Sequence, residues 1–397
     1  MECYPVSQQP PREGVVCLPF DAAAPMARAA FALSDARQLT APEGLAFLDQ
    51  NRLGPAPDWL TPAWRRAMEE GRVRAVNRQK PGRPAPWSAG GKKRLNLLAL
   101  GDVGSTLLLA LRLCGGQALS SIGICDVRPA AAQRWEMEIN QIYWPGEYDG
   151  LPPVEIIGEE QLFDGDAFVF CASKAIPPVG GGVRDVRMAQ LEENGKIVAH
   201  YARLARQKRF AGLFAVVSDP VDPLCQRALD VSNRDEGGRW DGAGLLPEQI
   251  RGFGLGVMNA RAAYYAKRDP ALSDFLTQGR AYGPHGEDLV IANSLTEYDD
   301  ERSRRLTRLA VESNLRTREL GFKPFVAPAC SSGALSLICA LTGRWHYSSL
   351  SFGGIFLGCR NRQAPAGAQC ECLPLPPELY ARLEAAYHNL EAIGHGG

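Results

Sequence analysis

The chain carries a glycine turn of the kind that binds nucleotide phosphates, within residues 95–126 (LNLLALGDVGSTLLLALRLCGGQALSSIGICD). Gly101 and Gly104 stand between an apolar run and an apolar helix, and Asp126 ends the next apolar run. Gly101 lets the backbone approach a pyrophosphate, Gly104 lets helix and strand pack closely, and the helix N-terminus faces the anion. A carboxylate at Asp126 can accept hydrogen bonds from ribose hydroxyls and would repel a 2′-phosphate. The motif therefore predicts a dinucleotide site that prefers NAD to NADP, although Ala99 replaces the first glycine of the pattern.

The elements that must hold this turn are predicted from the hydrophobic pattern. Short apolar runs bounded by turn residues are typical of buried strands, and longer runs with helical periodicity are typical of helices. From residue 95 onward the two alternate, which predicts an α/β fold with a doubly wound parallel Rossmann sheet and right-handed crossovers. The predicted strands are 95–100, 122–125, 167–171, 213–218 and 251–255, and the predicted helices are 105–114, 184–205 and 220–229.

The pattern changes after residue 256 and predicts a second, mixed α/β domain that carries the substrate site. Its predicted helices lie near 258–267, 299–320, 329–341 and 377–392, with strand-like segments at 288–292 and 350–357. We therefore expect an N-terminal extension at 1–94, an NAD-binding Rossmann domain at 95–256 and a substrate domain at 257–397.

The N-terminal extension differs from the rest of the chain because it is rich in proline, poorly periodic and basic toward its end. Thr61 followed by Pro62 predicts a helix that runs to about Val76, and residues 79–93 are typical of a linker. A basic segment containing tryptophans can touch nucleic acid, but the neutral total charge argues against it. We expect no nucleic-acid partner and instead a solvated arm, or one that packs on a neighbouring subunit.

Composition sets further limits. Lys plus Arg and Asp plus Glu each number 44, so no global field steers the chain to nucleic acid or membrane. The sequence has no apolar run of about 18 residues and its N-terminus lacks a signal-peptide core, so we expect no membrane segment. The 11 cysteines are scattered, which favours reduced thiols in the cytoplasm. Cys370 and Cys372 lack a second pair or a nearby histidine, so we expect no metal site.

Four further motifs follow the nucleotide turn in chain order: RMAQLEEN at 187–194, VVSDPVD at 216–222, GFGLGVMNAR at 252–261 and GPHGED at 283–288. Over residues 95–390 this order resembles the lactate/malate dehydrogenase superfamily. The apolar segment 325–343 and the closing helix stand where that family has a substrate-lining helix and its last helix. VVSDPVD and the HG pair are the more specific of these motifs.

The resemblance implies roles for several residues. Hydride transfer to a ketone places negative charge on the carbonyl oxygen, which a protonated imidazole can bind and protonate, and the resemblance gives this role to His285. Arg187 would polarise the carbonyl once a lid containing the glycines 180–182 closes, and Arg184, one turn earlier, would contact the substrate. The competing interpretation is an ordinary turn histidine and surface arginines. Cofactor contacts are implied at Gly101, Asp102, Val103, Gly104, Asp126, Cys171, Ala172, Asn194 and Ser218.

Three positions depart from the family pattern. Asp219 replaces the family asparagine, and an ionised carboxylate cannot donate a hydrogen bond. Counting five residues from Gly254 places Asn259 where the family has the aspartate that orients the histidine. The arginine that grips the substrate carboxylate then falls at Ala262. The nearest guanidinium, Arg261, lies one helical residue, about 100°, away and is the candidate for substrate binding if the register shifts. Because asparagine and aspartate have exchanged places, we hypothesise that Asp219 is the carboxylate partner of His285.

Two functions of different classes fit these residues. The first is an NAD-dependent oxidoreductase that acts on a small 2-hydroxy or 2-oxo acid such as lactate or malate. The alternative is an NAD(H)-binding relative, without catalysis or with an altered substrate, that serves in binding or assembly. The resemblance also implies a homodimer or homotetramer.

Overall fold

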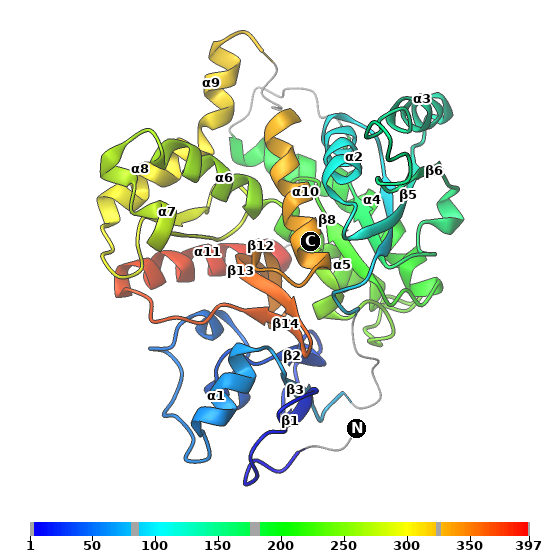
Figure 1. Ribbon diagram of the computed structural model, residues 1–397. Helices are drawn as coiled ribbons and strands as arrows, with labels where there is room; N and C mark the ends of the chain where they lie inside the picture. Colours follow the sequence, from blue (N-terminus) through cyan, green and yellow to red (C-terminus); the bar gives the residue numbers. More distant parts are fainter. Residues whose placement is uncertain (1–3, 81–86, 175–182, 323–326, 396–397) are drawn as a thin grey trace.

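The computed structural model describes residues 4–80, 87–174, 183–322 and 327–395, and Figure 1 shows their arrangement. At its centre is a six-stranded sheet in the order β6-β5-β4-β7-β8-β9, in which every pair of neighbours is parallel. Numbered within the sheet this is the order 3-2-1-4-5-6, so the predicted Rossmann fold is confirmed. The strands are β4 (Lys93–Leu98), β5 (Leu119–Cys125), β6 (Val154–Ile156), β7 (Ala167–Phe170), β8 (Leu213–Val216) and β9 (Ile250–Gly252).

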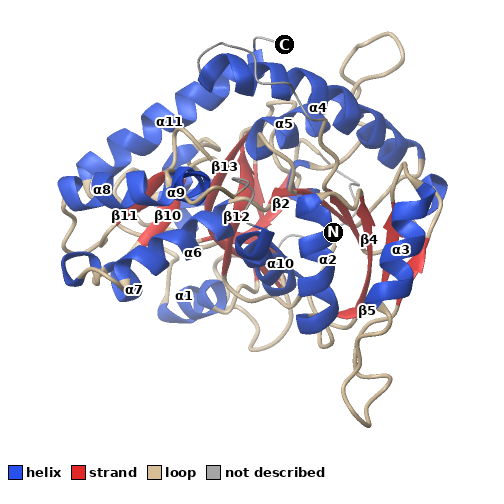
Figure 2. Ribbon diagram, turned by 90° about the horizontal axis from the view of Figure 1, so that it is seen from above, coloured by secondary structure: helices blue, strands red, loops and turns tan. Residues whose placement is uncertain are grey.

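Helices cover both faces of this sheet, as Figure 2 shows from above. One face packs on α2 and α3 through buried residues such as Leu107 and Ile139, and the other packs on α4 and α5 through Val198 and Leu224. Strands buried on both faces need continuous apolar runs, which is why the sequence pattern located them. The helices are α2 (Asp102–Cys114), α3 (Pro129–Ile139), α4 (Val183–Gln207) and α5 (Val221–Ser232).

The second half is a mixed α/β unit. A short antiparallel pair, β10–β11, and a three-stranded antiparallel sheet, β12-β13-β14, lie among helices α6 to α11. The bounds are α6 (Leu255–Ala266), α7 (Phe275–Gln278), β10 (Arg280–Tyr282), β11 (Val290–Ala292), α8 (Asp300–Val311), α9 (Ser313–Glu319), α10 (Ala327–Leu341), β12 (His346–Phe352), β13 (Ile355–Ala364), β14 (Gly367–Cys370) and α11 (Pro377–His395).

Two sequence predictions are wrong in this half. The predicted strand 350–357 is the tip of the β12–β13 hairpin, where Gly353 and Gly354 turn the chain with φ of +69° and +99°. The predicted helix 299–320 is two helices, because α8 ends at Val311 and α9 starts at Ser313. The apolar residues on both sides of each break do belong to strands or helices, as predicted. Their periodicity does not reveal that one or two residues interrupt the element.

The N-terminal extension is a folded unit rather than a solvated arm. Its strands pair in the order β1-β3-β2, and its apolar side chains share one core with the second half, so that Trp64 and Leu18 lie in the cluster that contains Phe352 and Leu379. Figure 1 shows this unit against β14 and α11. The expected solvated arm is therefore wrong for the described residues, whereas packing on another subunit stays a prediction. Its elements are β1 (Val16–Phe20), β2 (Ala30–Ala32), α1 (Pro62–Glu69) and β3 (Val73–Asn77).

The helix that begins at Pro62 is shorter than predicted. It ends at Glu69, and Gly71 follows with φ of +68°, a conformation that favours glycine and redirects the chain into β3. The extension is tied to the Rossmann sheet by Glu248, whose carboxylate accepts the backbone N–H groups of Ala29 and Ala30 at 3.1 and 3.0 Å. Burial raises the pKa of Glu248 to about 7.

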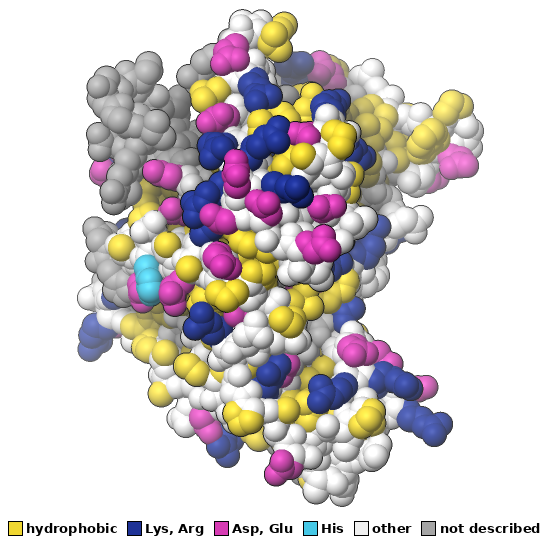
Figure 3. Space-filling model, turned by 90° about the vertical axis from the view of Figure 1, so that its left-hand side faces the viewer, with side chains coloured by type: hydrophobic (Ala, Val, Ile, Leu, Met, Phe, Trp, Pro, Cys, Tyr) yellow, Lys and Arg dark blue, Asp and Glu magenta, His cyan; other side chains and the backbone are white. Residues whose placement is uncertain are grey.

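The surface carries charge of both signs. On the face in Figure 3, basic and acidic side chains are interleaved, in keeping with a formal net charge of zero. Among the described residues, no helix is both long enough and apolar enough to cross a bilayer. Short 3₁₀ helices complete the described structure: η1 (Ala36–Leu39), η2 (Leu45–Leu48), η3 (Glu159–Gln161), η4 (Pro247–Gln249) and η5 (Pro270–Leu272).

Candidate functional site

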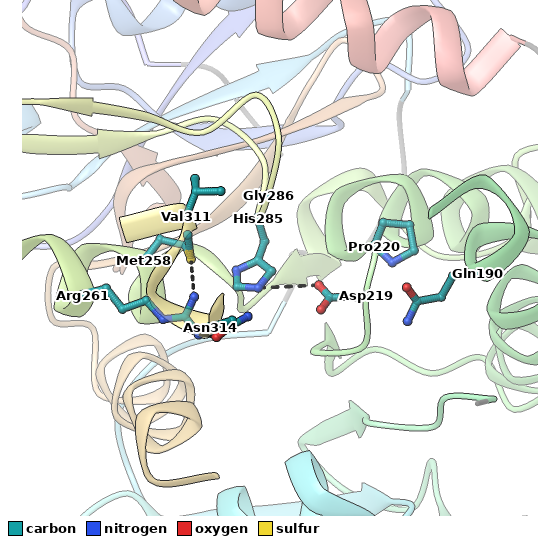
Figure 4. A pocket seen from close by; sticks show the side chains of 9 residues that line it. All are labelled: Gln190, Asp219, Pro220, Met258, Arg261, His285, Gly286, Val311 and Asn314. Carbon is teal, nitrogen blue, oxygen red and sulfur yellow. Dashed lines mark hydrogen bonds and ion pairs between the residues drawn. The ribbon is translucent and has the colours of Figure 1, made fainter. Parts of the chain in front are cut away.

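A pocket of about 120 Å³ lies between the carboxyl end of β8 and the second half of the chain. Figure 4 shows the side chains that line it, which come from α4, the β8–α5 turn, α6, the β10–β11 loop and the α8–α9 junction. The carboxyl edge of a parallel sheet is where α/β proteins place their ligands. The lining residues are Gln190, Asp219, Pro220, Met258, Arg261, His285, Gly286, Val311 and Asn314.

His285 stands in the β10–β11 loop with one ring nitrogen fixed by the backbone. Its Nδ1 lies 3.1 Å from the carbonyl oxygen of Gly254, and because a carbonyl only accepts, Nδ1 carries the hydrogen. Gly254 permits this approach, since a side chain there would begin 2.6 Å from the His285 Cβ. The imidazole therefore presents Nε2 to the pocket, as an acid or base for a bound ligand must do.

A buried carboxylate, that of Asp222, binds the backbone of the β10–β11 loop at His285. Asp222, in the first turn of α5, accepts the backbone N–H of His285 at 3.1 Å. Burial raises the pKa of Asp222 to about 7, against the lowering effect of the hydrogen bonds from His285 and the Ser349 side chain. The sequence contained this residue within VVSDPVD, but it gave no sign that the carboxylate anchors the loop of His285.

Asp219 lies beside Nε2, the nitrogen of His285 that faces the pocket. Its Oδ1 is 3.7 Å from His285 Nε2, so the structure brings the hypothesised pair together. The contact is on Nε2, however, whereas the orienting hydrogen bond to Nδ1 comes from the Gly254 carbonyl. Asp219 thus stands on the side from which a substrate would approach, rather than behind the ring.

Asn194 positions the strand ends around Asp219. It is fully buried, its Nδ2 donates to the Asp219 carbonyl at 2.8 Å, and its Oδ1 accepts the Lys174 N–H at 2.9 Å. One amide thereby joins the ends of β7 and β8 to α4. The same edge is closed by Ser218, whose hydroxyl donates to the Ala172 carbonyl at 2.6 Å.

Helix α6 contributes Met258 and Arg261 to the pocket. The described partners of the His285 ring nitrogens are Gly254 and Asp219, and not Asn259. Arg261, the nearest guanidinium to the expected position, therefore does reach the pocket. Met258 stands three residues before it, the spacing that the resemblance gives to the aspartate and the arginine.

Arg261 is held in the pocket by neutral groups. Its guanidinium donates to Asn314 Oδ1 at 2.7 Å and lies 3.6 Å from the Met258 sulfur. Desolvation by burial lowers the pKa of Arg261. Among the described residues, no carboxylate oxygen lies within 4.0 Å of it, so its charge is available to an anionic ligand. Neither Met258 nor Asn314 was predicted from the sequence. The spacing of three residues before Arg261 could have pointed to Met258, whereas no motif marks Asn314.

The predicted lid falls largely outside what the structure describes. Residues 175–182, which include the glycines 180–182, lie outside the described residues. Arg184 and Arg187 belong to the first turns of α4, but the described side chains of this helix begin at Ala189. Gln190, one turn after Arg187, is the α4 residue that lines the pocket.

The nucleotide turn keeps the conformation of a glycine turn. Ala99 has φ of +72°, which favours glycine, and α2 begins at Asp102 with Val103 behind it. A Cβ at Gly104 would fall 1.9 Å from the Ala99 carbonyl oxygen, whereas one at Gly101 would meet nothing within 4 Å. The close packing at Gly104 and the open space at Gly101 both fit a bound pyrophosphate.

Asp126 is less free than the sequence suggests. Its carboxylate accepts the backbone N–H groups of Leu100 at 2.7 Å and Arg128 at 2.8 Å, and 4% of its side chain is exposed. It therefore ties β5 to the turn, and its contact with a ribose stays a prediction. Cys171, at the end of β7, is buried, and burial raises the pKa of its thiol.

Comparisons with known proteins agree with this architecture. No family model matches the chain. Two L-lactate dehydrogenases align with it: that of Treponema denticola is 23% identical over 214 residues (53% of this chain, 60% of that protein), and that of Mesomycoplasma hyopneumoniae is 24% identical over 204 residues (51% and 58%). The chain thus spans about 60% of the length of the curated relatives it matches.

Solved structures of the same kind share the fold. Malate dehydrogenase of Aeropyrum pernix has a TM-score of 0.61 at 16% identity and covers 76% of this chain and 97% of its own. Minor L-lactate dehydrogenase of Enterococcus mundtii gives 0.59 at 16% (77% and 98%), and malate dehydrogenase of Archaeoglobus fulgidus, solved with NADH, gives 0.58 at 17% (76% and 98%).

The sheet order and the glycine turn define a Rossmann-type protein with a second α/β unit placed over the carboxyl ends of its strands. The sequence matches and the shared fold support the membership of the lactate/malate dehydrogenase superfamily that the motifs predicted, at low sequence identity.

Proposed function

We propose that this chain is an NAD(H)-dependent oxidoreductase that acts at C2 of a small carboxylic acid, with the 2-hydroxy/2-oxo pair as the reaction class of its relatives. The observation that carries the proposal is the pairing of His285 and Arg261 in one pocket. An imidazole whose Nε2 faces the pocket can exchange a proton with the C2 substituent. A guanidinium without an anionic partner among the described residues can bind the substrate carboxylate.

The nucleotide turn supports the choice of cofactor. Gly101, Val103 and Gly104 would hold the pyrophosphate of NAD, and Asp126 would lie near the adenosine ribose. When bound, the nicotinamide supplies or accepts the hydride. Asp102 adds a negative charge in the first turn of α2, which weakens an anion site, so replacing it with asparagine should tighten dinucleotide binding.

The residues of the chain would act in a simple order. Arg261 binds the carboxylate and so fixes C2 beside the imidazole, with Asn314 holding the guanidinium in place. His285 Nε2 then takes or gives the proton, while Nδ1 stays bonded to the Gly254 carbonyl. Arg184 and Arg187, at the start of α4, are proposed to complete the pocket when substrate is bound.

The test is a direct assay. Purified protein is mixed with NADH and a panel of 2-oxo acids that includes pyruvate and oxaloacetate, and with NAD and the matching 2-hydroxy acids. His285→Ala should lower kcat by about 100- to 10,000-fold, the usual contribution of general acid–base catalysis. His200→Ala, at an exposed histidine that pairs with Glu159, is the matched control and should leave the rate unchanged. Equal rates in the two variants would contradict the role of His285.

The alternative is a non-catalytic NAD(H)-binding relative. Met258 in the place of a carboxylate and Asp219 in the place of a hydrogen-bond donor both favour it, because each removes a group on which the relatives' pattern depends. Binding of NADH by fluorescence titration, without turnover of any C2-substituted acid, would support this alternative against the first.

A further inference from the structure

The pocket carries a carboxylate where a 2-oxo acid needs a hydrogen-bond donor. Asp219 Oδ1 lies 3.7 Å from His285 Nε2, the nitrogen that meets the substrate. An ionised carboxylate and a carbonyl oxygen both only accept hydrogen bonds, so neither satisfies the other. During ketone reduction the oxygen also gains negative charge, which a neighbouring carboxylate destabilises. The chemistry of a ketone therefore fits this pocket poorly.

The charges of the pocket fit a ligand that carries one charge of each sign. In Figure 4 the imidazole of His285 is drawn between Arg261 on one side and Asp219 on the other. Asn314 holds the Arg261 guanidinium, and Asp219 lies 3.7 Å from His285 Nε2. A carboxylate on the ligand matches Arg261, and a cationic N–H group on the adjacent carbon matches Asp219.

Apolar side chains line part of the pocket as well. Met258, Val311 and Pro220 contribute to its wall, and the space of about 120 Å³ is open to solvent. We therefore choose alanine, a small 2-amino acid, as the ligand to test.

We propose that the substrate of this site carries nitrogen rather than oxygen at C2, and that the chain interconverts a small 2-amino acid and its 2-imino acid. This inference rests on the proposed function, because it keeps the same carbon and the same cofactor. Asp219 is assigned as the residue that selects nitrogen, and Arg261 as the residue that binds the carboxylate.

The step balances as follows. In oxidation a hydride leaves C2 for the oxidised nicotinamide, and a proton leaves the ammonium nitrogen for His285 Nε2, which leaves an iminium (C=NH₂⁺). Water hydrolyses this iminium to the 2-oxo acid and ammonium. The nitrogen is cationic as the bound ammonium and again as the iminium, so Asp219 faces a positive group at the start and at the end of the step and no oxyanion forms beside it.

The experiment compares wild type with Asp219→Asn, which exchanges an acceptor-only group for one that also donates. Wild type should oxidise alanine with NAD at a kcat/KM at least tenfold above that for lactate, and should reduce pyruvate with NADH only when ammonium is present. Asp219→Asn should reverse this preference, losing at least tenfold on alanine and gaining at least tenfold on pyruvate alone. Asp58→Asn, the same change at an exposed aspartate of the extension, should behave as wild type.

A second measurement separates failure of this inference from failure of the proposed function. In thermal unfolding, alanine should raise the Tm of wild type and not that of Asp219→Asn. Turnover of pyruvate without ammonium by wild type, reduced in Asp219→Asn, would overturn the inference while leaving the oxidoreductase intact. Selective stabilisation by alanine without any turnover would refute the oxidoreductase and support the recognition by Asp219. No stabilisation of wild type by alanine would overturn that recognition.

Discussion

The nucleotide turn and the substrate pocket depart from the same family pattern in different ways. At the turn, Ala99 replaces a glycine, yet it adopts φ of +72° and the turn survives. In the pocket, the resemblance implies a donor at position 219 and a carboxylate at position 258, where the chain has Asp219 and Met258, so we expect different charges around His285. A site that binds through backbone groups tolerates a new side chain as long as the conformation is kept. A site that binds through side-chain charges acquires a new chemistry with each exchange.

The largest expected effect tests the charge beneath the pocket. The pKa of Asp222 is about 7 in the folded chain against 3.8 for a free aspartate, because the group is buried. Between these pH values the native state holds a proton that the unfolded state has lost, so the free energy of unfolding falls as the pH rises from about 4 to about 7. A shift of this size corresponds to roughly 4 kcal/mol.

Asp222→Asn removes this titration while keeping an acceptor for the His285 N–H. Urea unfolding at pH 5.0 and 7.5 should give a smaller difference in stability for the variant than for wild type. The slope that is left would combine two groups of opposite sign: Glu248, whose pKa burial also raises to about 7, and His346, whose pKa burial lowers to about 3. If the free energy of unfolding of the variant changed with pH as strongly as that of wild type, Asp222 would not be the titrating group. Asp58→Asn provides the matched control.

The second prediction tests whether the pocket binds by charge. Arg261→Leu should raise the KM for any carboxylate substrate by about 10- to 100-fold, since a charge-assisted hydrogen bond contributes about 1.5–3 kcal/mol. Arg268→Leu is the control. Arg268 is exposed, packs on the ring of Tyr264 and stands seven residues after Arg261 in the sequence. Steady-state kinetics decide the question, and equal KM values in the two variants would remove Arg261 from the binding site.

The sequence predicted the Rossmann half well, for a physical reason. Strands β4, β7 and β8 are buried on both faces, and such strands must be continuous apolar runs. The extension was not predicted, because its core is completed by residues more than 300 positions away, such as Leu379 against Trp64. No local pattern contains that information.

The site was predicted in part. Motif order identified His285 as a candidate, and the asparagine–aspartate exchange suggested its pairing with Asp219. The sequence could not predict which ring nitrogen of His285 lies beside Asp219. The Gly254 carbonyl binds Nδ1 and leaves Nε2 facing Asp219, and this arrangement depends on tertiary structure. Arg261 was named as the nearest guanidinium, but the count placed the carboxylate-binding arginine at Ala262, since a count from Gly254 does not reveal where the strand ends and the helix begins.

A third prediction tests the backbone half of the comparison. A methyl group at Gly104 would lie 1.9 Å from the Ala99 carbonyl oxygen, so Gly104→Ala should cost about 1–3 kcal/mol of stability and abolish tight NADH binding. Gly101→Ala has open space around its Cβ, so its stability should hardly change. Its methyl group would still block a pyrophosphate, and NADH affinity should fall. Denaturant unfolding and NADH titration of both variants measure the two effects separately.

The smallest effect is expected at Ala99, and it has the opposite sign. An L-residue in the left-handed region costs roughly 1 kcal/mol that glycine does not pay, so Ala99→Gly should raise the free energy of unfolding by about 0.5–1 kcal/mol. Ala110→Gly, inside α2, is the matched control and should lower stability by a similar amount. Urea unfolding of the pair decides between two causes. Destabilisation by Ala99→Gly would mean that packing of the alanine methyl group outweighs the strain, and the turn would then depend on its side chain as the pocket does.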